Sequence, residues 1–248
     1  MAIYDDYARR SRIGAGVSIK RRQAATIFAR GINSTMNTSG EVLEIGPGDG
    51  YIAALTKCAE LPYTAIEGND TVAANLRNSG FNVLSGYVPP LPFGLHSGYR
   101  CCFMLHVLEH MKSASDAGQV ISEIFNLLAP GGAIVIACPD YSRWGHYFYD
   151  CDYTHTYPVT RRRLNQMLVD QGFEIVQHTI YCGPMFGYIS LPISWLAKVL
   201  YWPSLDDLIG PDRLKDVLNR GFLTFLPNLL TVARRPSNSR TVIGEDVG

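Results

Sequence analysis

The sequence lacks an excess of charge of either sign, since 22 basic side chains balance 22 acidic ones and the isoelectric point lies near 7.0. Proteins that bind nucleic acid normally present a basic surface to the phosphates, so this balance argues against a nucleic-acid partner. Internal repeats and low-complexity tracts are also absent from the sequence. A chain of 248 residues is long enough to bury a large core as one domain.

Cysteine pairs with the C-x-x-C spacing are missing as well, although the chain has six cysteines. Several of them lie inside apolar, strand-like stretches, which indicates reduced core residues rather than disulfides or zinc ligands. Reduced cysteines predict a cytoplasmic location. The N-terminal stretch MAIYDDYARRSR contains acidic side chains and no apolar segment, so a secretory signal is not expected.

An uninterrupted apolar run of membrane-spanning length is also absent. Residues 181–202 carry Lys198 as their one charge, but Pro184 and Pro192 interrupt them, together with two glycines and two serines. A spanning helix needs about 20 consecutive, predominantly apolar residues. We therefore expect no stable membrane insertion and predict a cap or an interfacial segment here.

The most informative stretch that is present is an apolar strand leading into a glycine-rich turn, residues 41–50. Gly46, Gly48 and Gly50 allow the backbone to turn sharply and to approach a ligand without a Cβ in between. The next helix, from Tyr51, then directs its N-terminal N–H groups at the ligand. A dinucleotide-binding fingerprint would place the third glycine at position 51, but that residue is tyrosine.

An acidic residue, Glu44, stands two positions before the first glycine, and the E-x-G-x-G-x-G pattern resembles the first motif of class I S-adenosylmethionine-dependent methyltransferases. The resemblance implies S-adenosyl-L-methionine as the cofactor, bound by Glu44 and the three glycines. Glu67 ends a second apolar stretch. An acid at that place can accept hydrogen bonds from both ribose hydroxyls, whether the cofactor is S-adenosylmethionine or a dinucleotide. A nicotinamide-dependent oxidoreductase and a cofactor-binding partner protein without catalysis are the alternatives.

Strand-like and helix-like stretches alternate from residue 41 onward, which is typical of an α/β fold with a parallel sheet. We expect a seven-stranded, mostly parallel, Rossmann-like sheet with helices on both faces and a helical cap inserted near the C-terminus. The expected strands are residues 41–45, 63–67, 81–84, 100–105, 133–138, 173–181 and 222–232. The expected helices are residues 17–32, 50–58, 70–78, 115–128 and 161–170. Asp70 or Thr71 is expected to cap the helix at 70–78, and Thr160 the one at 161–170.

A single methyltransferase domain is expected to occupy residues 1–235. Within it, residues 1–40 form a lid and a first helix, 41–180 the cofactor-binding core, 181–221 the cap and 222–235 the last strand. The polar tail, residues 236–248, is expected to be disordered. In the resembling family an N-terminal aromatic side chain often closes over the methionine end of the cofactor, a role for Tyr7 or Tyr4 here.

The stretch HVLEH follows the fourth expected strand, and ligands of open parallel sheets bind beyond the carboxyl ends of the strands. It resembles many small-molecule methyltransferases, which places Leu105 and His106 beside the cofactor's sulfonium. His110 follows at a spacing that would put both histidines on one helical face, but no other ligand pattern accompanies them, so we predict no metal site. The family commonly holds adenine with an acid or amide after the third strand, and this sequence has none there. Tyr87 or a backbone carbonyl is expected to bind adenine instead.

A long aromatic loop follows the fifth expected strand, and its DYTHTYP stretch resembles the D-x-T-H segment of bacterial methyltransferases that act on sugars and other small metabolites. Asp152 is close enough in sequence to orient His155, whose imidazole would be the general base for an acceptor hydroxyl. Alternatively, His155 only shapes the loop, or His106 is the base. The element that is methylated (O, N or C) and the oligomeric state stay open.

Three arginines begin the helix after Thr160. Cations at a helix N-terminus oppose the helix dipole, so an anion bound by Arg161, Arg162 and Arg143 is one explanation of the pattern. Exposed arginines paired with nearby acids are the other. The sequence as a whole predicts methyl transfer to a small-molecule acceptor, with an oxygen of a sugar or other anionic metabolite favoured.

Overall fold

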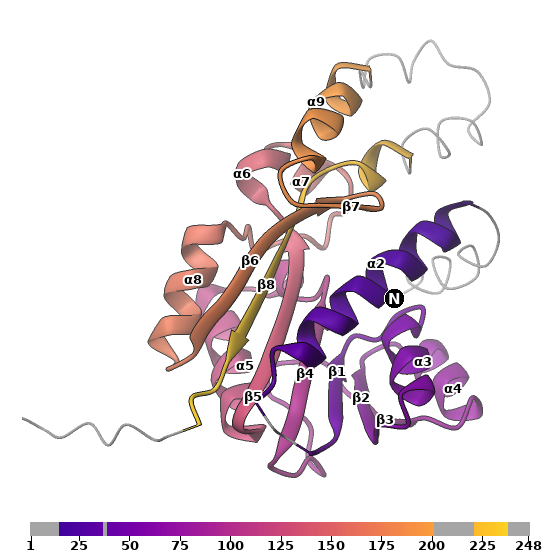
Figure 1. Ribbon diagram of the computed structural model, residues 1–248, viewed down its shortest axis with the longest axis vertical. Coiled ribbons are helices and arrows are strands. Elements are labelled where there is room, and N and C mark those ends of the chain that lie inside the picture. The colour runs from indigo at the N-terminus through magenta and orange to yellow at the C-terminus, as the bar shows by residue number, and fades with distance from the viewer. Residues whose placement is uncertain (1–14, 37–38, 201–220, 238–248) are drawn as a thin grey trace, which may run out of the picture.

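The structure, a computed structural model, describes residues 15–36, 39–200 and 221–237. Within these residues the fold is a mostly parallel, eight-stranded sheet with helices on both faces (Figure 1). The strand order is β3-β2-β1-β4-β5-β8-β6-β7. The strands are β1 (Val42–Ile45), β2 (Tyr63–Glu67), β3 (Asn82–Ser85), β4 (Tyr99–Leu105), β5 (Leu128–Pro139), β6 (Glu174–Cys182), β7 (Met185–Phe186) and β8 (Asn228–Arg234).

The register of the parallel strands brings their carboxyl ends to one edge of the sheet. Ile45 at the end of β1 lies opposite Ile66 of β2 and Met104 of β4. β8 runs antiparallel between β5 and β6, so β6 has the same direction as β5. Every βα turn that follows a parallel strand therefore opens at the same edge, where ligands of such sheets bind.

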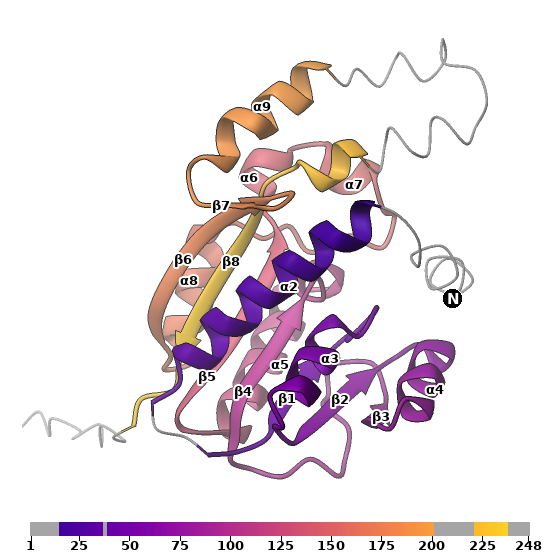
Figure 2. The ribbon, with the colours of Figure 1, turned by 45° about the vertical axis from the view of Figure 1, so that its right-hand side comes forward.

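The helices form two layers. They are α2 (Ala15–Asn33), α3 (Tyr51–Cys58), α4 (Asp70–Asn78), α5 (Ala114–Leu127), α6 (Tyr141–Trp144), α7 (Tyr147–Asp150), α8 (Arg161–Asp170) and α9 (Ser190–Leu200), with the short 3-10 helix η1 (Leu108–His110). Apolar side chains of α2, α3 and α4 pack on one face of the sheet, and those of α5 and α8 pack on the other. Figure 2 shows α2 crossing one face of the sheet with α5 and α8 behind it.

Helix α2 approaches the sheet closely because Gly31 faces it. A Cβ on Gly31 would lie 2.7 Å from Val135 of β5 and 2.8 Å from the ring of Phe103 in β4. The ring of Phe28, one turn earlier, stacks on Phe103 with 5.8 Å between ring centroids. The absence of a side chain at one position thus sets the spacing between the helix and the two central strands.

The helix caps follow from short polar side chains. Asn69 caps α4 by accepting a hydrogen bond from the N–H of Val72, so the expectation that Asp70 or Thr71 would do so is wrong. Thr160 caps α8 by accepting from the N–H of Arg163 over 3.3 Å, as expected.

The structure differs from the expected sheet near its ends. There are eight strands rather than seven because Met185–Phe186 pairs with the end of β6. β5 begins at Leu128, since the Ala-Pro-Gly-Gly stretch continues the strand through an irregularity in its pairing with β4. Residues 221–224 are helical, so β8 begins at Asn228 instead of 222.

The cap begins with α9, above the carboxyl edge of the sheet (Figure 2). Residues 201–220 of the expected cap lie outside the described residues, as do Tyr4, Tyr7 and the tail from residue 238. Across the part of the chain that the structure describes, no helix has both the length and the apolar character needed to cross a bilayer.

Candidate functional site

The glycine turn between β1 and α3 has the backbone that its sequence predicts. Gly46, Gly48 and Gly50 all have left-handed conformations, with φ of 68°, 50° and 73°. A Cβ on Gly46 would lie 2.6 Å from Val107, and one on Gly50 would lie 2.9 Å from Leu76. At Gly48, by contrast, a Cβ would meet no described atom within 4 Å. The turn is therefore packed against protein at its two ends and open at its centre.

The N-terminus of α3 adds donors to this opening. Gly50 is the N-cap residue, and among the described side chains none makes a capping hydrogen bond to the helix. The first N–H groups of an α-helix have no partner within the helix and favour an anionic or polar ligand. The open Gly48 and the uncapped helix start together fit the carboxylate end of an amino-acid cofactor.

Glu67 stands at the carboxyl end of β2, beside the turn. Its Oε1 accepts a hydrogen bond from the N–H of Asn69 over 2.8 Å. Burial raises the pKa of Glu67, and backbone hydrogen bonds from Asn69, Gly48 and Gly68 oppose that shift. The carboxylate is thus held by the same backbone that forms the turn, as a ribose-binding acid requires.

Tyr87 lies over the neighbouring backbone. A Cβ on Gly68 would come within 2.5 Å of the Tyr87 ring, so the ring rests directly on that glycine. Tyr87 is nevertheless 69% exposed. An exposed aromatic side chain therefore lies next to the expected ribose site, and contact of Tyr87 with adenine stays a prediction.

Glu44 lies beneath the turn and not at its surface. It is 2% exposed, and its Oε2 accepts a hydrogen bond from the hydroxyl of Tyr63. Burial raises the pKa of Glu44 to about 8, against the lowering effect of that hydrogen bond. Contact of this carboxylate with the cofactor stays a prediction; its observed contact braces β1 against β2.

The end of β4 presents Leu105 and His106 to the same edge. The N–H of His106 donates to the carbonyl of Ala137 over 2.8 Å, and its φ is 56°. Left-handed backbone is uncommon for residues other than glycine and tends to occur where function requires it. The imidazole of His106 is half exposed.

His106 makes two side-chain contacts that link distant parts of the chain. Its Nδ1 lies 3.1 Å from Oε1 of Glu109, and its Nε2 lies 3.0 Å from the hydroxyl of Tyr181. Glu109 is 1% exposed and Tyr181 is 3% exposed. The buried carboxylate of Glu109 therefore orients the imidazole of His106 through Nδ1. The other ring nitrogen, Nε2, shares a hydrogen bond with the hydroxyl of Tyr181.

The expectation of a shared helical face for His106 and His110 is wrong. His106 precedes η1, and the left-handed turn at His106 breaks the helical spacing. His110 instead faces Thr154, whose Oγ1 lies 2.9 Å from its Nδ1.

His155 is held by backbone and not by Asp152. Its Nδ1 lies 2.7 Å from the carbonyl oxygen of Phe148, while Oδ1 of Asp152 accepts from the N–H and hydroxyl of Thr154. The expected orientation of His155 by the Asp152 carboxylate is therefore wrong. Burial lowers the pKa of His155, which is 9% exposed.

The three arginines expected to hold an anion are divided between two places. Arg143 forms an ion pair with the fully buried Asp140, which balances its charge. Arg161 and Arg162 line a hollow of about 380 Å³ between α8 and β6, together with Asn165, Ile175 and His178. The structure does not bring Arg143 together with the other two.

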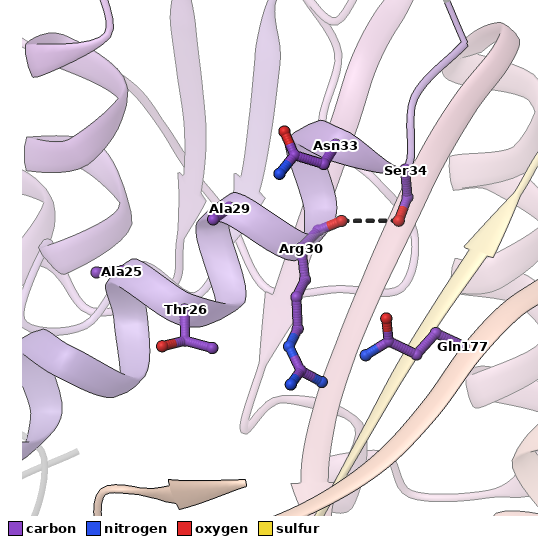
Figure 3. A pocket seen from close by; sticks show the side chains of 7 residues that line it. All are labelled: Ala25, Thr26, Ala29, Arg30, Asn33, Ser34 and Gln177. Atoms are coloured by element: carbon purple, nitrogen blue, oxygen red, sulfur yellow. Dashed lines mark hydrogen bonds between the residues drawn. The ribbon is translucent and has the colours of Figure 1, made fainter. Parts of the chain in front are cut away.

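A second hollow lies between α2 and β6, away from the carboxyl edge (Figure 3). Its volume is about 680 Å³, and it is lined by Ala25, Thr26, Ala29, Arg30, Asn33, Ser34 and Gln177. Gln177 pairs with Val232 in the middle of the sheet, far along β6 from its carboxyl end. The glycine turn contributes nothing to this hollow, so it is not the cofactor site.

Glu109 and Tyr181 are site residues that the sequence analysis did not identify. Glu109 had a local signal, because it follows His106 by three residues in HVLEH and a 3-10 turn brings such residues together. Tyr181 had none, because its contact with His106 joins residues 75 positions apart.

Comparison with known proteins identifies the group to which this site belongs. A family model described as a methyltransferase domain matches residues 20–178, which include the glycine turn, Glu67 and His106. No curated protein sequence shows significant similarity to the chain.

Solved structures share the fold. A chain in the Haloferax volcanii complex between the Trm112 methyltransferase activator and a methyltransferase is 17% identical, with a TM-score of 0.63 over 94% of this chain and 97% of that one. A SAM-dependent methyltransferase from Archaeoglobus fulgidus is 18% identical, with a TM-score of 0.57 over 86% of this chain and 94% of that one.

A third structure holds a cofactor product. The Haemonchus contortus phospholethanolamine N-methyltransferase 2, solved with phosphomonomethylethanolamine and S-adenosylhomocysteine, is 14% identical, with a TM-score of 0.57 over 86% of this chain and 52% of that one. With the matched domain, the glycine turn and the acid at the end of β2, the chain belongs to the class I S-adenosylmethionine-dependent methyltransferases.

Proposed function

We propose that this enzyme transfers the methyl group of S-adenosylmethionine to a hydroxyl oxygen of a small molecule, a sugar or another anionic metabolite, with His106 as the general base. The observation that carries the proposal is the series of contacts from Glu109 through His106 to the hydroxyl of Tyr181. It lies next to the glycine turn, because Val107 is the residue against which Gly46 packs.

The cofactor fits the turn on the evidence of its backbone. Gly48 leaves open space where any side chain would stand, and α3 offers uncapped N–H groups beside it. Glu67 would accept the ribose hydroxyls, and Leu105 would line the path to the methyl group. When bound, S-adenosylmethionine supplies an electrophilic methyl group, and the protein's task is to hold an acceptor oxygen in line with it.

The contacts of His106 define its proton chemistry. The carboxylate of Glu109 can only accept, so Nδ1 of His106 carries a hydrogen and Nε2 carries the lone pair. The hydroxyl of Tyr181 donates to Nε2 and marks the position of an acceptor hydroxyl. An acceptor hydroxyl that displaced the Tyr181 hydroxyl from Nε2 would give its proton to that nitrogen as its oxygen takes the methyl group, and the Glu109 carboxylate would stabilise the imidazolium.

Two further features bear on the acceptor and on the compartment. An anionic group on the acceptor would rely on Arg161 and Arg162, because the charge of Arg143 is balanced by Asp140. All six cysteines are free thiols, and five of them are wholly or partly buried, which supports a reducing, cytoplasmic setting.

The variant that tests the base is His106→Asn. Asparagine tolerates left-handed backbone better than alanine but offers no imidazole, so the fold at position 106 should survive. After a screen of neutral, phosphorylated and carboxylated sugars identifies an acceptor, kcat should fall about 10² to 10⁴-fold with cofactor affinity nearly unchanged.

The matched control is His96→Asn, at the other end of β4, which should keep the wild-type kcat. An unchanged kcat in His106→Asn would exclude His106 as the base. Cofactor binding without turnover against any acceptor class would favour a non-catalytic binding protein.

A further inference from the structure

The carboxylate of Glu109 is only half satisfied. Its Oε1 faces His106, but among the described residues its buried Oε2 has no hydrogen-bond partner. Glu109 is 1% exposed, and a buried polar atom without a partner destabilises the fold, more so when it carries charge. Such an atom needs a partner, and its neighbours are side chains that can ligate a metal ion.

Two histidines lie beside this carboxylate. One ligand atom from each of Glu109, His110 and His155 lies within 4.8 Å of the other two. The two imidazole rings have their centroids 5.0 Å apart. Glu109 and His110 are neighbours in η1, whereas His155 comes from the loop after α7, so the fold brings the third side chain to the other two.

The backbone contact of His155 prepares it for ligation. Its Nδ1 lies 2.7 Å from the carbonyl oxygen of Phe148, which can only accept, so Nδ1 carries the hydrogen and Nε2 the lone pair. Histidine ligands of metals characteristically donate their other nitrogen to a carbonyl or carboxylate, which fixes the ring. His110 has a comparable contact from Nδ1 to Oγ1 of Thr154, at 2.9 Å.

We propose that Glu109, His110 and His155 bind one divalent transition-metal ion, of which Zn²⁺ is the best match. Two imidazole nitrogens and one carboxylate oxygen form a known ligand set for Zn²⁺ with a further position open to water or substrate. Bonds of about 2.1 Å place tetrahedral ligand atoms about 3.4 Å apart, so the three atoms need to close by at most about 1.4 Å.

The ion would fasten the loop to the sheet edge. The N–H groups of Thr156 and Tyr157 already donate to the backbone carbonyl of Glu109, at 3.0 and 2.9 Å. A metal held by Glu109 and His155 would add a side-chain tie to this backbone junction. Because Glu109 also orients His106, the ion would lie one carboxylate away from the proposed base.

The test is metal content, measured without any acceptor. The full-length protein, stripped with EDTA and then incubated with Zn²⁺ and dialysed, should retain one Zn²⁺ per chain by elemental analysis. Replacement by Co²⁺ should produce the intense visible absorption of a tetrahedral site, and added Zn²⁺ should raise the Tm. These readouts are independent of the proposed methyl transfer.

Single variants with a matched control locate the site. His155→Ala and Glu109→Gln should each lose stoichiometric Zn²⁺ and the Co²⁺ absorption, whereas His146→Ala, at an exposed histidine just before α7, should keep both. Wild-type protein that retains no Zn²⁺ and shows no Co²⁺ absorption would overturn the proposal, whatever the folding of the variants. Retention in both ligand variants would overturn it equally.

Discussion

At the scale of single residues, Glu44 ties stability to pH. Its carboxyl is buried against Tyr63, and burial raises its pKa to about 8 from an ordinary value of 4.5. A group with a raised pKa in the folded state stabilises the fold fully below its unfolded pKa and loses that contribution as pH rises through the folded pKa. The window for Glu44 is therefore pH 4.5 to about 8.

Glu44→Gln should remove this dependence. Glutamine keeps an acceptor for the Tyr63 hydroxyl but does not titrate, so the variant should gain free energy of unfolding relative to wild type as pH rises across that window. Urea denaturation at several pH values measures the difference. Glu60→Gln, an exposed acid, should follow wild type throughout, and parallel curves for Glu44→Gln and wild type would contradict the assignment.

The candidate site shows how far single residues can be predicted from sequence. The three glycines and Glu67 lie where the pattern indicates, because strand, turn and helix are encoded locally. The hydrogen-bond partners of the histidines are harder to predict from the sequence. The predicted partner of His155 was the nearest acid in sequence, Asp152, but a backbone carbonyl takes that role.

At the scale of elements, the β1–α3 turn allows a controlled test of cofactor binding. Gly48→Val places a side chain in the open centre of the turn and should abolish S-adenosylmethionine binding, measured by calorimetry, while the far-ultraviolet circular dichroism stays native. The strain of valine at positive φ has to be separated from the blocking of the ligand.

Gly80→Val supplies that separation. Gly80 follows α4 with φ of 85°, and a Cβ there would meet no described atom within 4 Å, as at Gly48. Both variants carry similar backbone strain, but Gly80 is not part of the turn. If both variants lose S-adenosylmethionine binding equally, the loss comes from destabilisation of the fold. Intact binding in Gly48→Val would show that the cofactor does not bind at this turn.

Regular elements were predicted best where signals were local. Tyr63–Glu67, Asp70–Asn78 and Arg161–Asp170 match their expected bounds. The predicted bounds and types of elements are wrong mainly where tertiary contacts, and not the local sequence, determine the secondary structure. Phe222, Phe225 and Leu226 have the spacing of one helical face, and residues 221–224 are helical although apolar content suggested a strand. The two-residue β7 forms only because the end of β6 lies beside it.

At the scale of the whole molecule, the contact of α2 with the sheet controls stability. Gly31→Val would force a side chain to within 2.8 Å of Val135 and Phe103, both in central strands, and should lower the free energy of unfolding by about 1 to 3 kcal/mol. Gly16→Ala, on the same helix with open space around it, should leave stability unchanged or raise it. Urea denaturation compares the two, and equal stabilities would contradict this account of the packing.

The position of β8 has a consequence for how the enzyme is made. β8 lies between β5 and β6, yet among the described strands it is the last to leave the ribosome. Until residues 228–234 emerge, β5 and β6 both expose an open edge and have no strand to join them. We expect the nascent chain to form the glycine turn early and His106 to meet Tyr181 only after β8 has inserted, because β8 is the strand that joins β6 to β5. A premature stop before Asn228 should therefore yield a chain that retains the nucleotide-binding half and lacks an assembled centre for methyl transfer.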